Sequence, residues 1–85
     1  MTRDYVLWHL REAAEALTNT IAEMEADPEY SREALGVEMA HLYHHLNTAW
    51  NARDAATARV DACSAEDFRE WRQFPADIDM NLGVE

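Results

Sequence analysis

Glu38, His41 and His45 have residue types and a spacing that could bind a metal ion. They stand at i, i+3 and i+7, so a helix would place all three on one side. A histidine pair at i and i+4 can bind zinc or another divalent transition metal, and Glu-x-x-His occurs in di-iron carboxylate bundles. Those bundles draw matching ligands from several helices, whereas residues 4–26 contain no Glu-x-x-His. A complete site would need a ligand from that segment or from another subunit, so metal binding is an alternative to histidines at a surface or an interface.

The other candidate motifs do not support catalysis or a cofactor. The D-x-D-x-N motif at residues 77–81 begins like a calcium-binding loop, but Leu82 occupies the position that requires glycine. Cys63 has no histidine near it in the sequence, and the negative charge of Asp61 close by disfavours a reactive thiolate. The sequence also has no GxSxG, CxxC or glycine-rich loop. We therefore predict that the protein is not an enzyme.

The composition predicts a helical protein and narrows the choice of partners. The 85 residues carry a net charge of −10, and fifteen are alanine while only two are glycine and two are proline. This is a composition that favours helices over strands and turns. A protein that binds nucleic acids or anionic membranes needs basic patches on its own surface, and this chain is strongly acidic. We therefore expect neither as a direct partner. The apolar runs are too short to span a bilayer, and a single cysteine suits a reducing cytosol.

Two long helices are predicted, at residues 4–26 and residues 32–62, because each segment has apolar residues at alternating spacings of three and four. Pro28 interrupts the pattern, and we expect Ser31 to be the N-cap of the second helix. The alternative is a start at Pro28, which would then be the first helical residue. A break of about five residues makes the helices antiparallel neighbours. The predicted seams are Leu7, Leu10, Ala14, Leu17, Ile21 and Met24 in the first helix, and Leu35, Met39, Leu42, Leu46, Ala49, Arg53, Ala56 and Val60 in the second.

Small residues, among them Ala13, Ala16 and Thr20, flank the first seam and would allow the helices to approach closely. Pairing Ile21 with Met39 sets the expected register. In this register the second helix extends beyond the first at the end away from the hairpin turn.

A third, short helix is predicted at residues 64–73, with Ser64 as its N-cap. Folded back onto the end of the hairpin, it would bring Trp71 together with Trp8 and Trp50. We interpret this aromatic cluster as a small core that closes the bundle, with a ligand pocket as the alternative.

Residues 76–85 alternate apolar and polar side chains, as a strand does, but the chain offers no second strand to pair with them. We expect an extended C-terminal arm docked on a helix, with a strand completed by another chain or a disordered segment as alternatives. The predicted fold is all-α: a long antiparallel helical hairpin and a short third helix in one domain at residues 1–75, followed by the arm at residues 76–85.

The second helix is unusually poor in charge, since Glu38 is the only charged residue among the nineteen residues 34–52. Charge depletion with histidine, asparagine and aromatic residues is typical of an interface. We therefore expect a homodimer in which two hairpins form a four-helix bundle. The candidate partner-binding residues are His41, His44, His45, Asn47 and Asn51.

The function predicted from the sequence is that of a small cytosolic binding or assembly protein, acting by contact through a helical surface. One alternative is a metal-binding helical protein that uses Glu38, His41 and His45. A second is an acidic inhibitor or nucleic-acid mimic that docks on a basic partner, because residues 1–30 contain seven acidic residues and two arginines.

Overall fold

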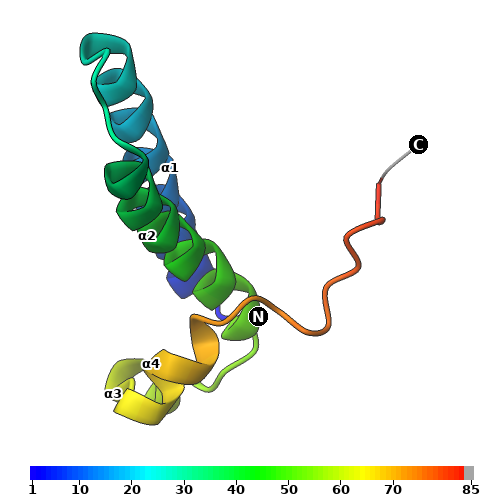
Figure 1. The fold of residues 1–85 in the computed structure, drawn as a ribbon. Coiled ribbons are helices and arrows are strands. Elements are labelled where there is room, and N and C mark those ends of the chain that lie inside the picture. The colour runs from blue at the N-terminus through cyan, green and yellow to red at the C-terminus, as the bar shows by residue number, and fades with distance from the viewer. Residues whose placement is uncertain (84–85) are drawn as a thin grey trace.

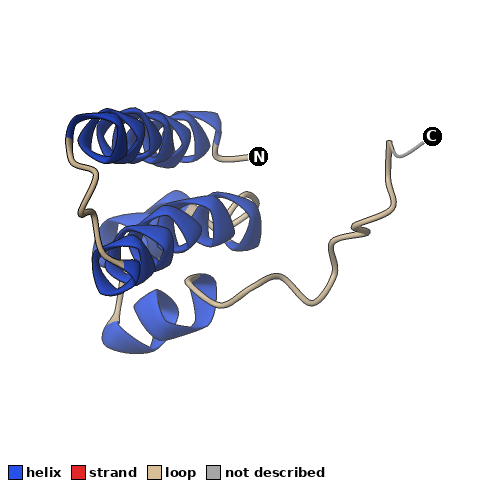
Figure 2. Ribbon diagram, turned by 45° about the horizontal axis from the view of Figure 1, so that its top comes forward, coloured by secondary structure: helices blue, strands red, loops and turns tan. Residues whose placement is uncertain are grey.

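The computed structural model describes residues 1–83, which form four helices and no strand. The helices are α1 (Arg3–Ala26), α2 (Arg32–Asn51), α3 (Thr57–Ala62) and α4 (Ala65–Trp71). The two long helices α1 and α2 lie side by side as an antiparallel hairpin, and the short helices α3 and α4 lie together at the end of the hairpin that contains the N-terminus (Figures 1 and 2). The predicted all-α hairpin fold is therefore confirmed.

The turn of the hairpin is held by short polar side chains. The Asp27 carboxylate accepts a hydrogen bond from the backbone N–H of Glu29, and the Ser31 hydroxyl accepts one from the N–H of Ala34. An N-cap side chain satisfies a backbone donor that has no partner within the helix. The predicted Ser31 cap is thus confirmed, and α2 begins at Arg32.

The second helix is shorter than predicted, because α2 ends at Asn51 and residues 57–62 form the separate helix α3. No proline or glycine stands at this point in the sequence. Instead, Thr2 donates two hydrogen bonds, from its N–H to the Arg53 carbonyl (2.6 Å) and from its hydroxyl to the Ala55 carbonyl (2.7 Å). A continuous helix would need those carbonyls for its own hydrogen bonds, so contacts with the N-terminus end α2 here.

The hairpin packs mainly through small residues, and Ala49 of α2 is the one residue of the two predicted seams that is buried. The buried residues of α1 are His9, Ala13, Ala16 and Thr20, and the alanines allow close approach of the two backbones. The larger side chains of the predicted seam are left beside this contact. Between 42% and 49% of the surface remains exposed at Leu10, Leu17, Ile21 and Met24.

The register of the hairpin also differs from the predicted one. Aligning Ile21 with Met39 would place His9 close to Trp50, whereas the structure places the His9 ring against His45. The displacement is more than one helical turn. It follows from the choice of face, since the pair of buried histidines becomes part of the contact between α1 and α2.

The two short helices turn back onto the hairpin through α4. The Ser64 hydroxyl accepts from the Asp67 N–H, as predicted, and Cys63 before it has a left-handed backbone (φ 35°). Arg59 of α3 donates to the Asp67 carboxylate at 2.6 Å and 3.0 Å, which joins α3 to α4. Trp71 at the end of α4 is buried, with 3% of its surface exposed.

Residues 76–83 leave the helical body as an extended arm with little regular structure (Figure 1). The base of the arm is docked, because the Asp77 carboxylate accepts from the Trp50 indole N–H (2.9 Å) and from Arg53 (3.2 Å). Trp50 therefore packs against the arm, and the predicted cluster of all three tryptophans is wrong for this residue. Met80 and Leu82 farther along are mostly exposed, and the last two residues of the predicted arm lie outside the described residues.

Within residues 1–83, none of the helices combines the length and the apolar character that crossing a membrane requires.

Candidate functional site

Three histidines form a chain of ring contacts across the hairpin. The Nδ1 atoms of His9 on α1 and His45 on α2 are 2.9 Å apart, and the Nε2 atoms of His45 and His41 are also 2.9 Å apart. Both distances are those of a hydrogen bond. His45 thus uses both ring nitrogens, and the chain leads from the exposed His41 to the buried His9.

Two proton arrangements of neutral rings satisfy both contacts. In the first, His41 donates to His45 and His45 donates to His9, which leaves an N–H on Nε2 of His9. In the second, His9 donates to His45 and His45 donates to His41, which leaves a bare lone pair on Nε2 of His9. In either case this Nε2 atom is buried and has no hydrogen-bond partner in the described structure.

The surroundings of the chain favour uncharged histidines. Burial, together with the nearby His45 and His44, lowers the pKa of His9 from 6.5 to about 4. Burial also lowers the pKa of His44, where His45 and Arg72 add to the effect, and that of His45, where Glu12 partly opposes it. The pKa shifts of His9, His44 and His45 therefore all favour the uncharged form of these three rings.

An aromatic pocket of about 300 Å³ adjoins the histidines, between the hairpin helices α1 and α2 and the short helices α3 and α4. Aromatic rings provide much of its wall, and the rings of Tyr5 and Trp8 both meet the His9 ring edge to face, at centroid distances of 4.7 Å and 4.9 Å. On the other side, Phe68 of α4 lies 5.0 Å from the His44 ring. The pocket thus has largely apolar walls, to which the side chains of His9, His44 and His45 contribute.

The predicted partner-binding residues are not presented together on one free surface. Asn47 is buried and donates to the Arg72 carbonyl (2.9 Å), while Asn51 donates to the carbonyls of Trp71 (2.9 Å) and Gln73 (2.7 Å). The amides of both residues thus hold the end of α4 against α2. The charge-poor character of this part of α2 is explained by contacts within the chain.

The histidines among the predicted partner-binding residues differ in their surroundings. His45 is buried between His9 and His41, His44 borders the aromatic pocket, and His41 is exposed. A role for these residues in partner binding remains a prediction.

The metal hypothesis for Glu38, His41 and His45 also remains a prediction. The part of the chain that the structure describes contains no group of three or more His, Cys, Asp or Glu side chains arranged to hold a metal ion. The reason is visible at His45, whose nitrogens point at other imidazole nitrogens, whereas metal ligands must converge on a common point. Metal binding by His45 would require one of these contacts to break.

His9 is the residue of this site that reasoning from the sequence missed. Its signal is present, because His9 precedes Ala13, Ala16 and Thr20 at spacings of four, three and four along the face that is buried. The larger apolar residues on the neighbouring face gave the stronger pattern and concealed it.

No family model, curated protein or solved structure matches this chain. The interpretation of the site therefore depends on the geometry and chemistry of its own residues.

The role of Asn47 leads to a first prediction. Replacing it in Asn47→Ala removes the donor that satisfies the Arg72 carbonyl, and we expect the free energy of unfolding to fall by about 1–2 kcal/mol. The matched control is Asn19→Ala, at an exposed asparagine of α1, which should change it by less than about 0.5 kcal/mol. Urea unfolding followed by tryptophan fluorescence measures both, and equal effects of the two substitutions would contradict the role given to Asn47.

Proposed function

We propose that this chain is a small assembly protein that acts by contact and not by catalysis, and that it forms a homodimer through one apolar flank of its helical hairpin. The observation that carries the proposal is a set of large apolar side chains on both long helices that the fold leaves between 36% and 49% exposed. This apolar flank consists of Leu10, Leu17, Ile21 and Met24 of α1 with Met39, Tyr43 and Leu46 of α2.

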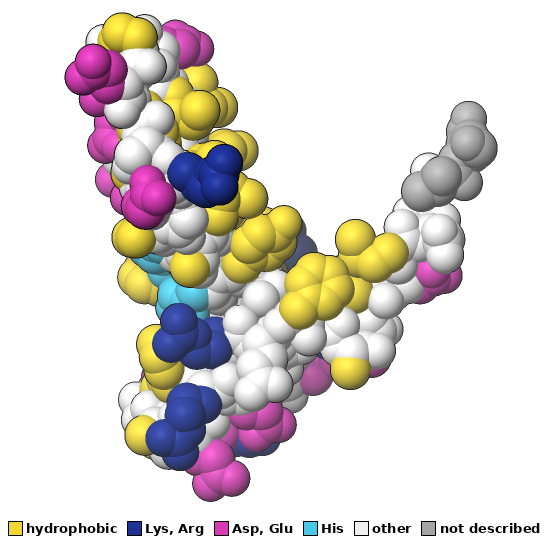
Figure 3. Space-filling model, viewed as in Figure 1, with side chains coloured by type: hydrophobic (Ala, Val, Ile, Leu, Met, Phe, Trp, Pro, Cys, Tyr) yellow, Lys and Arg dark blue, Asp and Glu magenta, His cyan; other side chains and the backbone are white. Residues whose placement is uncertain are grey.

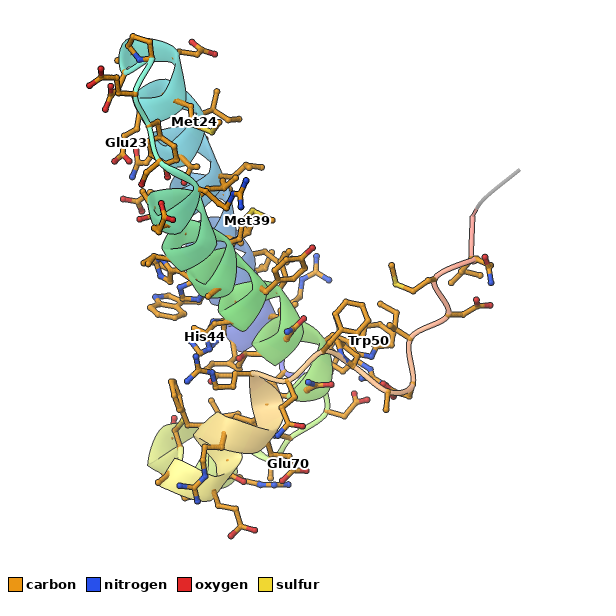
Figure 4. All side chains as sticks on the ribbon, viewed as in Figure 1. Glu23, Met24, Met39, His44, Trp50 and Glu70 are labelled. Carbon is orange, nitrogen blue, oxygen red and sulfur yellow. The ribbon has the colours of Figure 1, made fainter. Side chains whose placement is uncertain are left out.

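The residues of the apolar flank lie on one side of the hairpin. Figure 3 shows apolar side chains gathered along the right-hand side of the hairpin. In the same view, Figure 4 shows Met24 of α1 and Met39 of α2 pointing toward that side, while His44 lies on the opposite side. Leu10 and Leu46 line the same surface groove, which joins the two helices at the end near the arm. None of the seven residues is charged.

A second copy of the chain is the occupant that fits this flank best. Its residues follow spacings of three, four and seven, which suit packing of one helix pair on another. The buried apolar residues among residues 1–83 are four alanines, Pro75 and Trp71, so a single copy has little core of its own. A twofold dimer would let the same flank of two copies cover one another in a four-helix bundle.

This interface differs from the one predicted around His41, His44 and Asn47. Asn47 already packs against the α4 end within the chain, and the apolar flank lies away from His44 (Figure 4).

The single free thiol, Cys63, supports placing the protein in a reducing compartment such as the cytosol.

The proposal is tested by Ile21→Glu in the apolar flank. In a twofold dimer the substitution occurs twice and puts two carboxylates into an apolar contact, so we expect the dissociation constant to rise by at least about 100-fold. Sedimentation equilibrium should give twice the chain mass of 9.8 kDa for the wild type and the monomer mass for Ile21→Glu.

Two control variants place the same charge on other faces of the hairpin. Asn19→Glu on α1 and Val37→Glu on α2 change exposed residues that are not part of the apolar flank, and both should remain dimeric. A wild type that has the monomer mass at tens of micromolar would overturn the proposed dimer. Dissociation by Val37→Glu but not by Ile21→Glu would place the contact on another face.

A further inference from the structure

The C-terminal arm carries large apolar side chains that the described part of the chain leaves largely uncovered. Between 36% and 82% of the surface is exposed at Phe74, Ile78, Met80 and Leu82. Met80 and Leu82 lie in a hydrogen-bonded turn, in which the Asp79 carbonyl accepts from the Leu82 N–H at 3.1 Å. The Asp79 carboxylate supports the same turn by accepting from the Asn81 N–H at 2.9 Å. The arm therefore presents apolar groups on a local structure of its own.

The apolar flank of the hairpin continues onto this arm. Two surface grooves, of about 420 Å³ and 240 Å³, are both lined by Leu46 of the flank and Ile78 of the arm. Leu10 adds to the first groove, while Tyr43 and Met80 add to the second. Figure 3 shows the hairpin and the arm as the two sides of an open V, with apolar side chains on both inner sides. The flank and the arm thus form one apolar surface around a hollow.

The arm is fixed at its base and then leaves its own hairpin. The Asp77 carboxylate accepts from Trp50 and Arg53, and the Gln73 carbonyl accepts from the Asn51 amide. Beyond these contacts the chain runs away from α1 and α2 (Figures 1 and 2). The hollow between the arm and the hairpin is therefore open to a partner.

A single copy has more exposed surface than a compact monomer of its size. Its accessible surface is 6421 Å², whereas a compact monomer of 9.8 kDa exposes about 5,200 Å². Its radius of gyration is 14.8 Å, against about 12 Å for a compact chain of 85 residues. The excess of about 1,200 Å² is larger than the share of about 800 Å² that each partner buries in a standard interface. The open V therefore provides the area that a stable dimer needs.

The charge of the hollow favours a second copy as its occupant. Among the described residues, the only charged one that lines either groove is Arg53. Its guanidinium is already paired with Asp54 at 3.6 Å and with Asp77 at 3.2 Å. A charged partner would lose its hydration there without gaining a free opposite charge. The apolar flank of a second copy carries no charge and matches the hollow in chemistry.

We propose that the hollow between the apolar flank and the arm receives the hairpin of a second copy, so that the arm of each copy clasps the other. This inference rests on the dimer proposed above and adds a second contact to it. The two flanks cover one another, and Met80 and Leu82 of each arm pack against the helices of the partner. A twofold axis makes the exchange reciprocal, so both arms are used.

Contacts between copies can be detected in the wild-type chain. Chains with ¹³C-labelled methyl groups and unlabelled chains are unfolded, mixed in equal amounts and refolded, and an isotope-filtered NOESY spectrum records only contacts between copies. The Met80 methyl group of one copy should show such contacts with methyl groups on α1 or α2 of the other. A dimer in which Met80 has contacts only within its own chain would overturn the exchange and leave the dimer standing. A wild type of monomer mass would overturn both.

A matched pair of substitutions measures what the arm contributes to the dimer. Met80 in the arm and Val37 on α2 have nearly the same exposure in one copy, 66% and 68%. In sedimentation equilibrium, Met80→Asp should raise the dissociation constant at least about 10-fold, because it places a charge in an apolar contact, and Val37→Asp should change it less than about 2-fold. An unchanged dissociation constant in Met80→Asp would overturn the exchange. Tighter association would overturn it as well, because it would show that the arm covers the flank of its own chain.

Discussion

Lowering the pH from 7 to 4 is expected to reduce the free energy of unfolding by about 3 kcal/mol through His9 alone. The pKa of His9 is lowered in the fold from 6.5 to about 4, so the folded state holds this ring neutral while the unfolded chain takes up a proton below pH 6.5. The contribution is complete above pH 6.5 and is lost as the pH falls toward 4. His44 and His45, whose pKa values are also lowered, act in the same direction.

Carboxylates account for a different part of the pH range. Hydrogen bonds from Arg59 lower the pKa of Asp67, and the Trp50 indole lowers that of Asp77, both from 3.8. Their contributions are present above that value and are lost only at lower pH. A loss of stability between pH 6.5 and 4 can therefore be assigned to the histidines.

Urea unfolding at a fixed protein concentration and at several pH values between 7.5 and 4 measures this effect. His9→Phe should have a much flatter profile over the same range, because it removes the group with the lowest histidine pKa. A wild-type free energy of unfolding that stays constant from pH 7 to 4 would contradict the lowered pKa of His9.

Trp71→Ala should destabilise the protein by about 3–5 kcal/mol, the range for removing a large aromatic side chain from a core. Trp71 is 3% exposed, and its ring lies 6.3 Å from Tyr5 and 5.3 Å from the Arg59 guanidinium. It is the one large side chain among the buried apolar residues of the described chain, so its removal takes away a large part of a small core. Its loss should free α4 from the hairpin.

Trp8→Ala is the matched control, because Trp8 borders the same pocket but has 52% of its surface exposed. Chemical unfolding followed by far-ultraviolet circular dichroism avoids the loss of fluorescence signal in both variants. We expect Trp8→Ala to cost less than half as much as Trp71→Ala. Similar losses would show that α4 does not dock through Trp71.

The starts of α2 and α4 could be predicted because they depend on neighbouring residues. Ser31 and Ser64 each accept a hydrogen bond from an N–H three residues later, as their positions in the sequence indicated. The same kind of local pattern could not predict the end of α2. Residues 52–56 are compatible with a helix, and hydrogen bonds from the distant Thr2 end it.

The choice of the buried face was the main error in reading the site from the sequence. A spacing of three and four identifies an apolar side of a helix but does not say which neighbour covers it. Ala13 and Ala16 let α1 and α2 approach closely, and the contact therefore forms there, with His9 inside it and Ile21 outside. The apolar flank, which the contact between α1 and α2 leaves partly exposed, is the basis for the proposed dimer.

The sequence by itself determined the helical class, the hairpin turn and the short capped helix at Ser64, because composition, apolar spacing and capping act over a few residues. Only the tertiary structure decided where α2 ends, which face of α1 is buried and which residues surround the pocket. Those features depend on contacts between distant residues, such as Thr2 with Arg53 and His9 with His45. A local pattern offers several packing solutions of similar merit, and the close fit of small side chains selects one of them.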